Sequence, residues 1–270
     1  MRIRLDVAYE GTRYAGWQIQ PDRPTVQSAL EDALRRVYGR HMRLAGASRT
    51  DAGVHALQQV AHFNTQPDDV AVPPEKVREA TQRYLPNDIA ILATREQPED
   101  WHSIASVTSK RYRFLIWEAE HAHPMLSRFT WRVPIGLDLA AMQQAATEIV
   151  GTHDFACFET TGAPRKSTVR TIYELTLREV QPGLPYSDVP VPGHIAGRLL
   201  ELQIEGDGFL YNMVRTIAGT LVKVGRGRWD AGDVARIIAS ADRNLAGETA
   251  PAAGLCLMRV RYDESTWQDE

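Results

Sequence analysis

The sequence predicts an α+β fold made of two similar halves, residues 1–105 and 106–262, followed by an acidic tail at residues 263–270 that we expect to be disordered. Three observations favour this class. Some segments alternate apolar and polar residues, while others repeat apolar residues at three- and four-residue spacing, so strands and helices share the chain. The order strand, helix, two strands, helix and strand is that of a ferredoxin-like or RRM-like unit, and a comparable order follows it. The 270 residues, 43% of them hydrophobic, can bury one large or two modest cores.

The first half opens with a predicted half-buried strand over residues 3–9, where apolar and charged residues alternate. A helix should follow, because Thr25 is a suitable N-cap, apolar residues recur at helical spacing, and Gly39 can end it. The remaining expected elements are a strand at 42–45, a strand at 58–64, a helix from Pro73 to about Arg83, and a strand after Pro86.

The second half begins with a predicted strand over 108–117 that places Tyr112, Phe114 and Ile116 on one face. Residues 181–193 contain four prolines and two glycines, which indicates a hairpin loop or an insertion. Two such halves can join their sheets and leave an active-site cleft where strand ends meet. The other expected elements are a helix from Asp138 to Val150 ending at Gly151, strands at 170–180 and 194–204, helices over 209–224 and from Asp230, and a strand at 255–262.

The charge balance limits what the protein can bind. The net charge is −3 and the isoelectric point is about 6.3, so any nucleic-acid site must be a local basic patch. Cys157 and Cys256 lie in apolar surroundings and are expected to be buried thiols. The N-terminus alternates charged and apolar residues, unlike a signal or transit peptide, and no apolar run has transmembrane length. We therefore expect a soluble, cytoplasmic protein.

Chemistry-bearing residues concentrate at residues 47–56, between two predicted strands, where a loop should rise from the sheet. Arg49 offers a fork of donors suited to a phosphate or a base edge. Asp51 offers a carboxylate that can act as a nucleophile or base. An Asp followed two residues later by Gly53 is also an ordinary turn, and His55 suits a structural hydrogen bond. The residue types alone leave both interpretations open.

The order of these residues adds information. Residues 49–56, RTDAGVHA, resemble the active-site motif of the tRNA pseudouridine synthase A family. Ser48 departs from the Gly that this family usually has there. The similarity extends over about residues 3–262, through at least five motifs in the family's order, and the other four are 9–18, 110–114 (KRYRF, with Phe114 in place of a second Tyr), 151–155 and 213–219.

This resemblance implies an isomerase that converts uridine to pseudouridine in the anticodon stem-loop, at positions 38, 39 and 40 of tRNA. It implies that Asp51 is the catalytic carboxylate, that Tyr112 contacts the target uridine, and that Arg215 lies near the catalytic Asp, where a guanidinium would hold the carboxylate ionised and oriented. Arg49 can fill the space of a flipped-out base or hold a phosphate. The resemblance also implies a continuous, mainly antiparallel sheet flanked by helices, a homodimer, and no cofactor. No phosphate-loop or metal-ligand motif is found in the sequence.

Structural alternatives stand beside several of these assignments. The segment around Tyr112 also suits an ordinary strand, Arg215 a snorkelling side chain, and residues 14–18 either a packed loop or a surface touching substrate. His153 and Asp154 are expected to be structural caps. The basic loop 164–170 suits an RNA-backbone contact or solvated charge.

Two rival functions also remain. A non-catalytic tRNA-binding protein, or RNA chaperone, would use the same cleft. A metal-dependent hydrolase would use Asp51, His55 and His62, although their spacing is poor for a single metal site.

Overall fold

The computed structural model describes residues 1–160, 167–181 and 197–263. These fall into two compact units, Met1–Lys110 together with the chain from Cys256 onward, and Arg111–Leu255. The sequence analysis had assigned residues 256–262 to the second half. They group with the first unit because their strand hydrogen-bonds to a strand of that unit.

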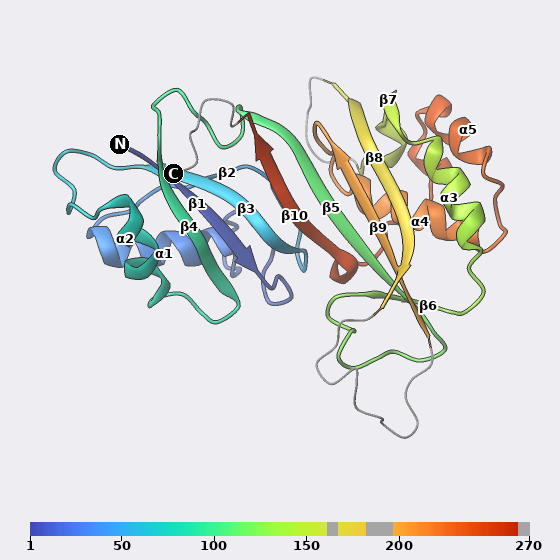
Figure 1. The fold of residues 1–270 in the computed structure, drawn as a ribbon, viewed down its shortest axis with the longest axis horizontal. Coiled ribbons are helices and arrows are strands. Elements are labelled where there is room, and N and C mark those ends of the chain that lie inside the picture. The colour runs from blue at the N-terminus through green and yellow to red at the C-terminus, as the bar shows by residue number, and fades with distance from the viewer. Residues whose placement is uncertain (161–166, 182–196, 264–270) are drawn as a thin grey trace. The chain divides into compact units, whose positions relative to one another are not determined.

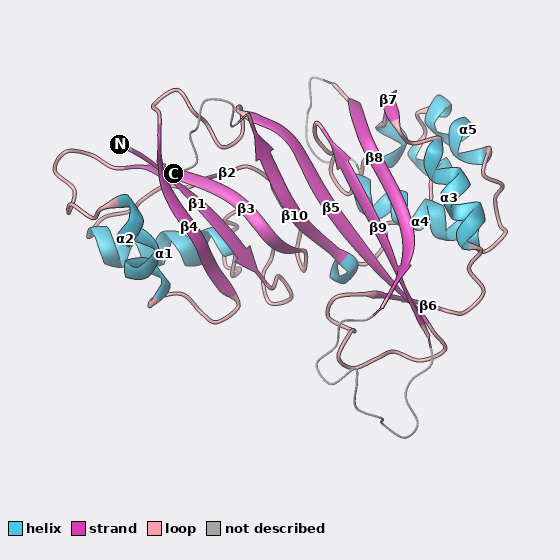
Figure 2. Ribbon diagram, viewed as in Figure 1, coloured by secondary structure: helices cyan, strands magenta, loops and turns pink. Residues whose placement is uncertain are grey.

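The α+β class is confirmed (Figures 1 and 2). The described residues form ten strands and five α-helices, and most of the strand pairs are antiparallel. None of the helices in the described part of the chain has the length and apolar character needed to cross a membrane.

In the first unit the strand order is β4-β1-β3-β10, with β2 also paired to β3. Strand β1 runs antiparallel to both of its neighbours, whereas β10 runs parallel to β3. The elements are β1 (Arg2–Tyr9), α1 (Val26–Tyr38), β2 (Ala45–Gly46), β3 (His55–Asn64), α2 (Pro74–Gln82), β4 (Ile89–Gln97) and β10 (Leu255–Tyr262).

Local chemistry explains the best-predicted helix. The Thr25 hydroxyl accepts a hydrogen bond from the Ser28 backbone N–H, at 3.2 Å, and so caps α1. Gly39 closes α1 in the left-handed conformation, at φ 73°. Both ends of this helix therefore follow from residues visible in the sequence.

The prediction of a half-buried β1 is wrong, because its charged face is buried too. Arg4 and Asp6 form an ion pair at 2.7 Å, with both side chains almost fully buried. The Arg4 guanidinium also lies 4.9 Å from the centre of the Tyr262 ring, which belongs to the same unit. The ion pair and the contact with the Tyr262 ring stabilise the buried charges of Arg4 and Asp6, which the alternating pattern predicts to be exposed to solvent.

In the second unit the strand order is β5-β9-β8-β7, and β6 pairs in parallel with β5. Helix α3 packs against β8 and α4. The elements are β5 (Val107–Glu118, whose first residues belong to the first unit), β6 (Trp131–Val133), α3 (Leu139–Thr147), β7 (Gly151–Asp154), η1 (Ala156–Phe158), β8 (Val169–Val180), β9 (Arg198–Gly206), α4 (Met213–Gly225), α5 (Asp233–Ser240), η2 (Arg243–Leu245) and η3 (Ala252–Gly254).

Three predicted boundaries in this unit are wrong. The helix from Asp138 ends at Thr147, and Gly151 opens a strand. The helix predicted from Phe209 begins only at Met213, because Asn212 adopts a left-handed conformation, φ 62°, which a right-handed helix cannot contain. The helix predicted from Asp230 begins at Asp233. The Pro-rich segment and the acidic tail lie almost entirely outside the described residues.

Candidate active site

The loop that carries Arg49 and Asp51 leaves the sheet between β2 and β3, as predicted. Ala45 and Gly46 pair with His62 and Ala61, and the Ala47 N–H then donates to the Val60 carbonyl at 2.7 Å. After this rung the chain turns away from β3. The loop therefore starts from a hydrogen-bonded sheet edge.

Asp51 begins a tight turn, as the spacing of Asp51 and Gly53 predicts. Its carbonyl accepts from the Val54 N–H at 3.1 Å, and Gly53 has a φ of 79°, which an L side chain rarely adopts. The Gly53 N–H donates to the carbonyl of Tyr14 at 3.3 Å. The Asp51 residue is half-buried. The turn fixes the backbone from which the carboxylate projects.

The loop after β1 packs against this turn. Trp17 donates its backbone N–H to the Thr50 carbonyl at 3.0 Å, and the Tyr9 hydroxyl is 2.7 Å from the Thr50 hydroxyl. A Cβ on Gly16 would lie 2.5 Å from the Thr50 carbonyl oxygen, so only glycine permits this approach. Tyr14 and Trp17 are buried. Of the two alternatives for residues 14–18, the structure shows the packed loop.

The two histidines of the hydrolase alternative have structural partners. The Nδ1 atom of buried His55 accepts from the Gly11 N–H at 3.0 Å. The Nδ1 atom of His62 is 2.8 Å from the Ser103 hydroxyl. Burial, with nearby His102 and Arg2, lowers the pKa of His62 to about 4. No group of three or more His, Cys, Asp or Glu in the described chain can hold a metal ion. This arrangement disfavours that alternative.

Arg49 differs from its neighbours. It is exposed between buried Ser48 and buried Thr50, so the loop directs its side chain to solvent. Within the described residues it makes no hydrogen bond or ion pair. Its guanidinium is therefore available to an anionic ligand.

Tyr112 lies on β5 in the second unit. It is buried along with Phe114 and Ile116, which confirms the predicted alternation. Its ring meets that of Phe209 edge to face, with centroids 5.1 Å apart. The segment around Tyr112 is therefore an ordinary strand with a buried face. The predicted contact between Tyr112 and uridine is not tested by this burial.

Two of the three cations around Tyr112, Arg111 and Lys110, are bound by other groups of the protein. Arg111 contacts the carboxylates of Glu205 and Glu174, its Nε and Nη2 donating to them at 2.7 Å each. Lys110 donates to the Ala47 carbonyl in the first unit, at 2.7 Å. Both cations are therefore already neutralised or hydrogen-bonded within the fold.

Arg215 occupies the first turn of α4 in the second unit. Its Nε donates to the Ala250 carbonyl at 2.6 Å, and its Nη1 to the Asn212 side-chain oxygen at 2.7 Å. The residue is half-buried, so it is not a snorkelling side chain at the helix edge. The left-handed backbone of Asn212 brings that acceptor within reach. The guanidinium is thus held in a defined orientation.

The remaining predicted polar residues have local roles. His153 and Asp154 lie on β7 rather than at a helix end, where the His153 Nε2 is 3.2 Å from the Val150 carbonyl and Asp154 accepts from the Ala156 N–H. Of the basic loop 164–170, residues 164–166 lie outside the described residues. Arg170 donates to the nearby Ser167 carbonyl at 3.1 Å.

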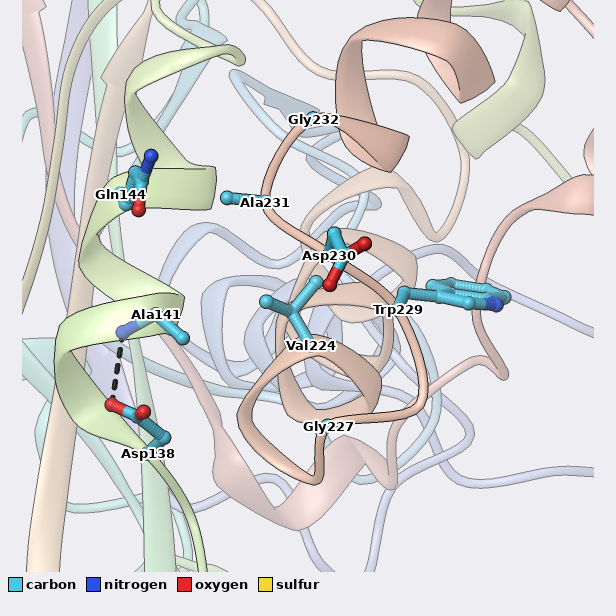
Figure 3. Close-up of a pocket in the computed structure, with 9 residues that line it drawn as sticks. All are labelled: Asp138, Ala141, Gln144, Val224, Gly227, Trp229, Asp230, Ala231 and Gly232. Carbon is cyan, nitrogen blue, oxygen red and sulfur yellow. Dashed lines mark hydrogen bonds between the residues drawn. The ribbon is translucent and has the colours of Figure 1, made fainter.

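The pocket in Figure 3 is a different site. Its lining comes from α3, the end of α4 and the segment before α5. The lining residues include Asp138 and Asp230, and none of them is basic. The Asp138 carboxylate caps α3 by accepting from the Ala141 N–H at 3.0 Å. An acidic lining repels a polyanion, so this pocket is not suited to RNA.

Sequence reasoning missed Gln59. This β3 residue is fully buried, and its amide makes two hydrogen bonds to the backbone of Ser48. A polar residue at an inward-facing strand position was the signal, since a buried amide needs partners.

Comparison with known proteins gives a full-length match. The family profile described as tRNA pseudouridine synthase matches residues 7–104 and 145–263. A tRNA pseudouridine synthase A of Ruminiclostridium cellulolyticum is 41% identical over 263 residues, covering 97% of this chain and 99% of that protein. Proteins of the same name from Pelobacter propionicus and a Thermoanaerobacter strain are 42% and 38% identical over 260 residues, with 96% and 99% coverage in each case.

Proposed function

The chain belongs to the tRNA pseudouridine synthase family, whose members are isomerases, and from this premise we propose that it forms pseudouridine in the anticodon stem-loop of tRNA, with Asp51 as the catalytic carboxylate. The substrate positions are those that the resemblance implies, 38, 39 and 40. We also propose that it acts as a cytoplasmic homodimer without a cofactor. A dimer would help a chain of net charge −3 to build a basic surface.

The observation that supports Asp51 most is the immobilisation of its loop. On one side of Asp51 the backbone of Ser48 is hydrogen-bonded to β3, and on both sides the backbone groups of Thr50 and Gly53 are hydrogen-bonded to the loop after β1. A side chain on such a backbone keeps its position without an ordering cost when substrate binds. A catalytic carboxylate that must approach a single carbon atom of the ribose needs such a fixed position.

The reaction needs such a group. The bond between N1 of uracil and C1′ of ribose breaks, the uracil rotates, and C5 bonds to the same C1′. C5 loses its proton and N1 gains one, so the product has the composition of the substrate. A carboxylate stabilises the detached sugar, as in retaining glycosidases. In this proposal Asp51 has that role, and the target base leaves the stack first.

The other assigned residues bind the substrate. Arg49 presents its exposed guanidinium to the RNA, where it holds a phosphate or fills the space of the extruded base. From the second unit, Tyr112 contacts the uracil and Arg215 supplies a guanidinium of fixed orientation. The roles of Tyr112 and Arg215 come from the family resemblance, and that of Arg49 from its position beside Asp51 and its exposure to solvent.

The test is tritium release from tRNA transcripts labelled at C5 of uridine. Pseudouridine formation frees this tritium, so we expect release with the wild-type enzyme, and none when the uridines at positions 38–40 are replaced by cytidine. Prior dialysis of the protein against a chelator should not change the rate, whereas a metal-dependent hydrolase would lose activity. Binding of tRNA without any tritium release would instead identify the non-catalytic alternative.

A further inference from the structure

Gln59 connects the sheet to the loop of Asp51. It lies on β3, and its side chain has no exposure to solvent. Its Oε1 accepts from the Ser48 N–H at 3.1 Å, and its Nε2 donates to the Ser48 carbonyl at 2.6 Å. One side chain therefore satisfies both backbone groups of a loop residue.

These two bonds extend the β2–β3 ladder by one rung. Gly46 pairs with Ala61, and Ala47 bonds to Val60, both through the backbone. At Ser48 the chain has already separated from β3, and the Gln59 amide spans the gap. The backbone of Gln59 pairs on its other side with Val7 of β1, so the amide projects from a strand held between two neighbours.

We propose that Gln59 is a positioning residue for the pseudouridine reaction, fixing the loop so that Asp51 and Arg49 project correctly. This inference rests on the proposed function of Asp51. The amide is suited to the task because it is uncharged at every working pH, donates and accepts in one plane, and loses little mobility in a packed strand. Breaking the clamp leaves two buried backbone groups at Ser48 without these partners.

The first variant is Gln59→Leu, which keeps the volume and removes both hydrogen bonds. We expect the single-turnover rate of tritium release, measured with enzyme in excess over labelled tRNA, to fall roughly 10- to 100-fold, as small displacements of reacting groups typically cause. The dissociation constant for tRNA should change less than the rate does, because buried Gln59 affects the RNA only through the loop that carries Arg49.

The matched control is Phe63→Leu, on the same strand. Phe63 is buried against Tyr38 and has no bond to the loop, so this variant lowers stability without releasing Ser48. The unfolding temperatures of the two variants are compared first. A control that loses as much rate at an equal loss of stability overturns the proposal, as does a Gln59→Leu rate within twofold of wild type.

The second variant, Gln59→Glu, tests the mechanism even where Gln59→Leu does not fold. An ionised carboxylate has no hydrogen to donate to the Ser48 carbonyl, whereas the protonated acid donates and accepts as the amide does. The rate of this variant relative to wild type should therefore rise as the pH falls. A ratio that is constant across the pH range contradicts the proposal.

Asp51→Asn is measured alongside to separate two failures. Full activity of Asp51→Asn means that the proposed function of Asp51 is wrong. An inactive Asp51→Asn together with a fully active Gln59→Leu means that only the positioning role is wrong.

Discussion

Arg49 and Arg111 each lie in a segment that resembles a motif of the family, yet their surroundings in the structure differ. Arg49 is exposed on a loop and has no partner among the described residues, whereas Arg111 lies between the carboxylates of Glu174 and Glu205 on two strands. Those two glutamates face each other directly across β8 and β9, so their like charges would repel without the guanidinium. A basic residue beside a motif is thus a candidate RNA contact only where no acid of the fold already neutralises it.

Among the variants that test this comparison, the largest effect is expected from Arg49→Ala. Because the exposed side chain makes no hydrogen bond or ion pair within the described residues, its loss should leave the unfolding temperature unchanged. Its loss should reduce kcat/KM for tRNA by roughly 100-fold, the amount that removal of a positioned charged contact typically costs. The measurement is steady-state tritium release combined with thermal unfolding.

The control for this prediction is Arg43→Ala, which removes an exposed arginine outside the motif in the same unit. An equal loss of kcat/KM in both variants would mean that Arg49 contributes only general positive charge. A marked drop in the unfolding temperature of Arg49→Ala would show that Arg49 stabilises the fold, as Arg111 is expected to do, and would contradict the comparison.

A smaller effect, on stability instead of activity, is expected from Arg111→Met. It leaves Glu174 and Glu205 facing each other without a cation, and we expect unfolding in denaturant to cost about 2 kcal/mol less, a value reduced for the partial exposure of the cluster. Adding Glu205→Gln should restore part of this loss, since the repulsion is removed. Equal stability of Arg111→Met and wild type would show that the cluster is energetically neutral.

The last prediction concerns how the stability of the fold depends on pH. The folded-state pKa of His62 is about 4, below the value of about 6.5 in an unfolded chain, so only the unfolded state takes up this proton as the pH falls from about 6.5 to 4. Stability should therefore decline over that window, by about 1 kcal/mol per pH unit. Above it the contribution is fully present, and below pH 4 no further loss occurs.

Denaturant unfolding at several pH values checks this prediction. His62→Gln should flatten the decline between pH 6.5 and 4, whereas His121→Gln, at an exposed position, should leave it unchanged. An unchanged slope in His62→Gln would assign the pH dependence to other groups.

Sequence alone was sufficient where the determinants are local. Thr25 and Gly39 mark the ends of α1, alternation places Tyr112 and Phe114 inside, and the Asp–Gly spacing forms the turn at Asp51. It failed where the determinant is a distant partner or an unusual backbone. The left-handed conformation of Asn212 shortens α4. The groups that contact the guanidinium of Arg4 or Arg111 include residues far along the chain, which the local pattern does not reveal.

The candidate site shows the same division. The motif predicts Asp51 and Arg49 as site residues, because its residue order is specific. The side chain that holds their loop, Gln59, contacts Ser48 across the β2–β3 connection, and its identity as a clamp depends on burial. Alternation can flag such a residue as an inward-facing polar group, while only coordinates show what it binds.

The most direct measurement of the central claim is single-turnover tritium release from C5-labelled tRNA by Asp51→Asn. The substitution keeps the size of the side chain and removes its negative charge. We predict a rate reduced by roughly 10³-fold or more, as for other essential catalytic groups, with tRNA affinity within about twofold of wild type. Tritium release at the wild-type rate would contradict the assignment of Asp51 as the catalytic carboxylate.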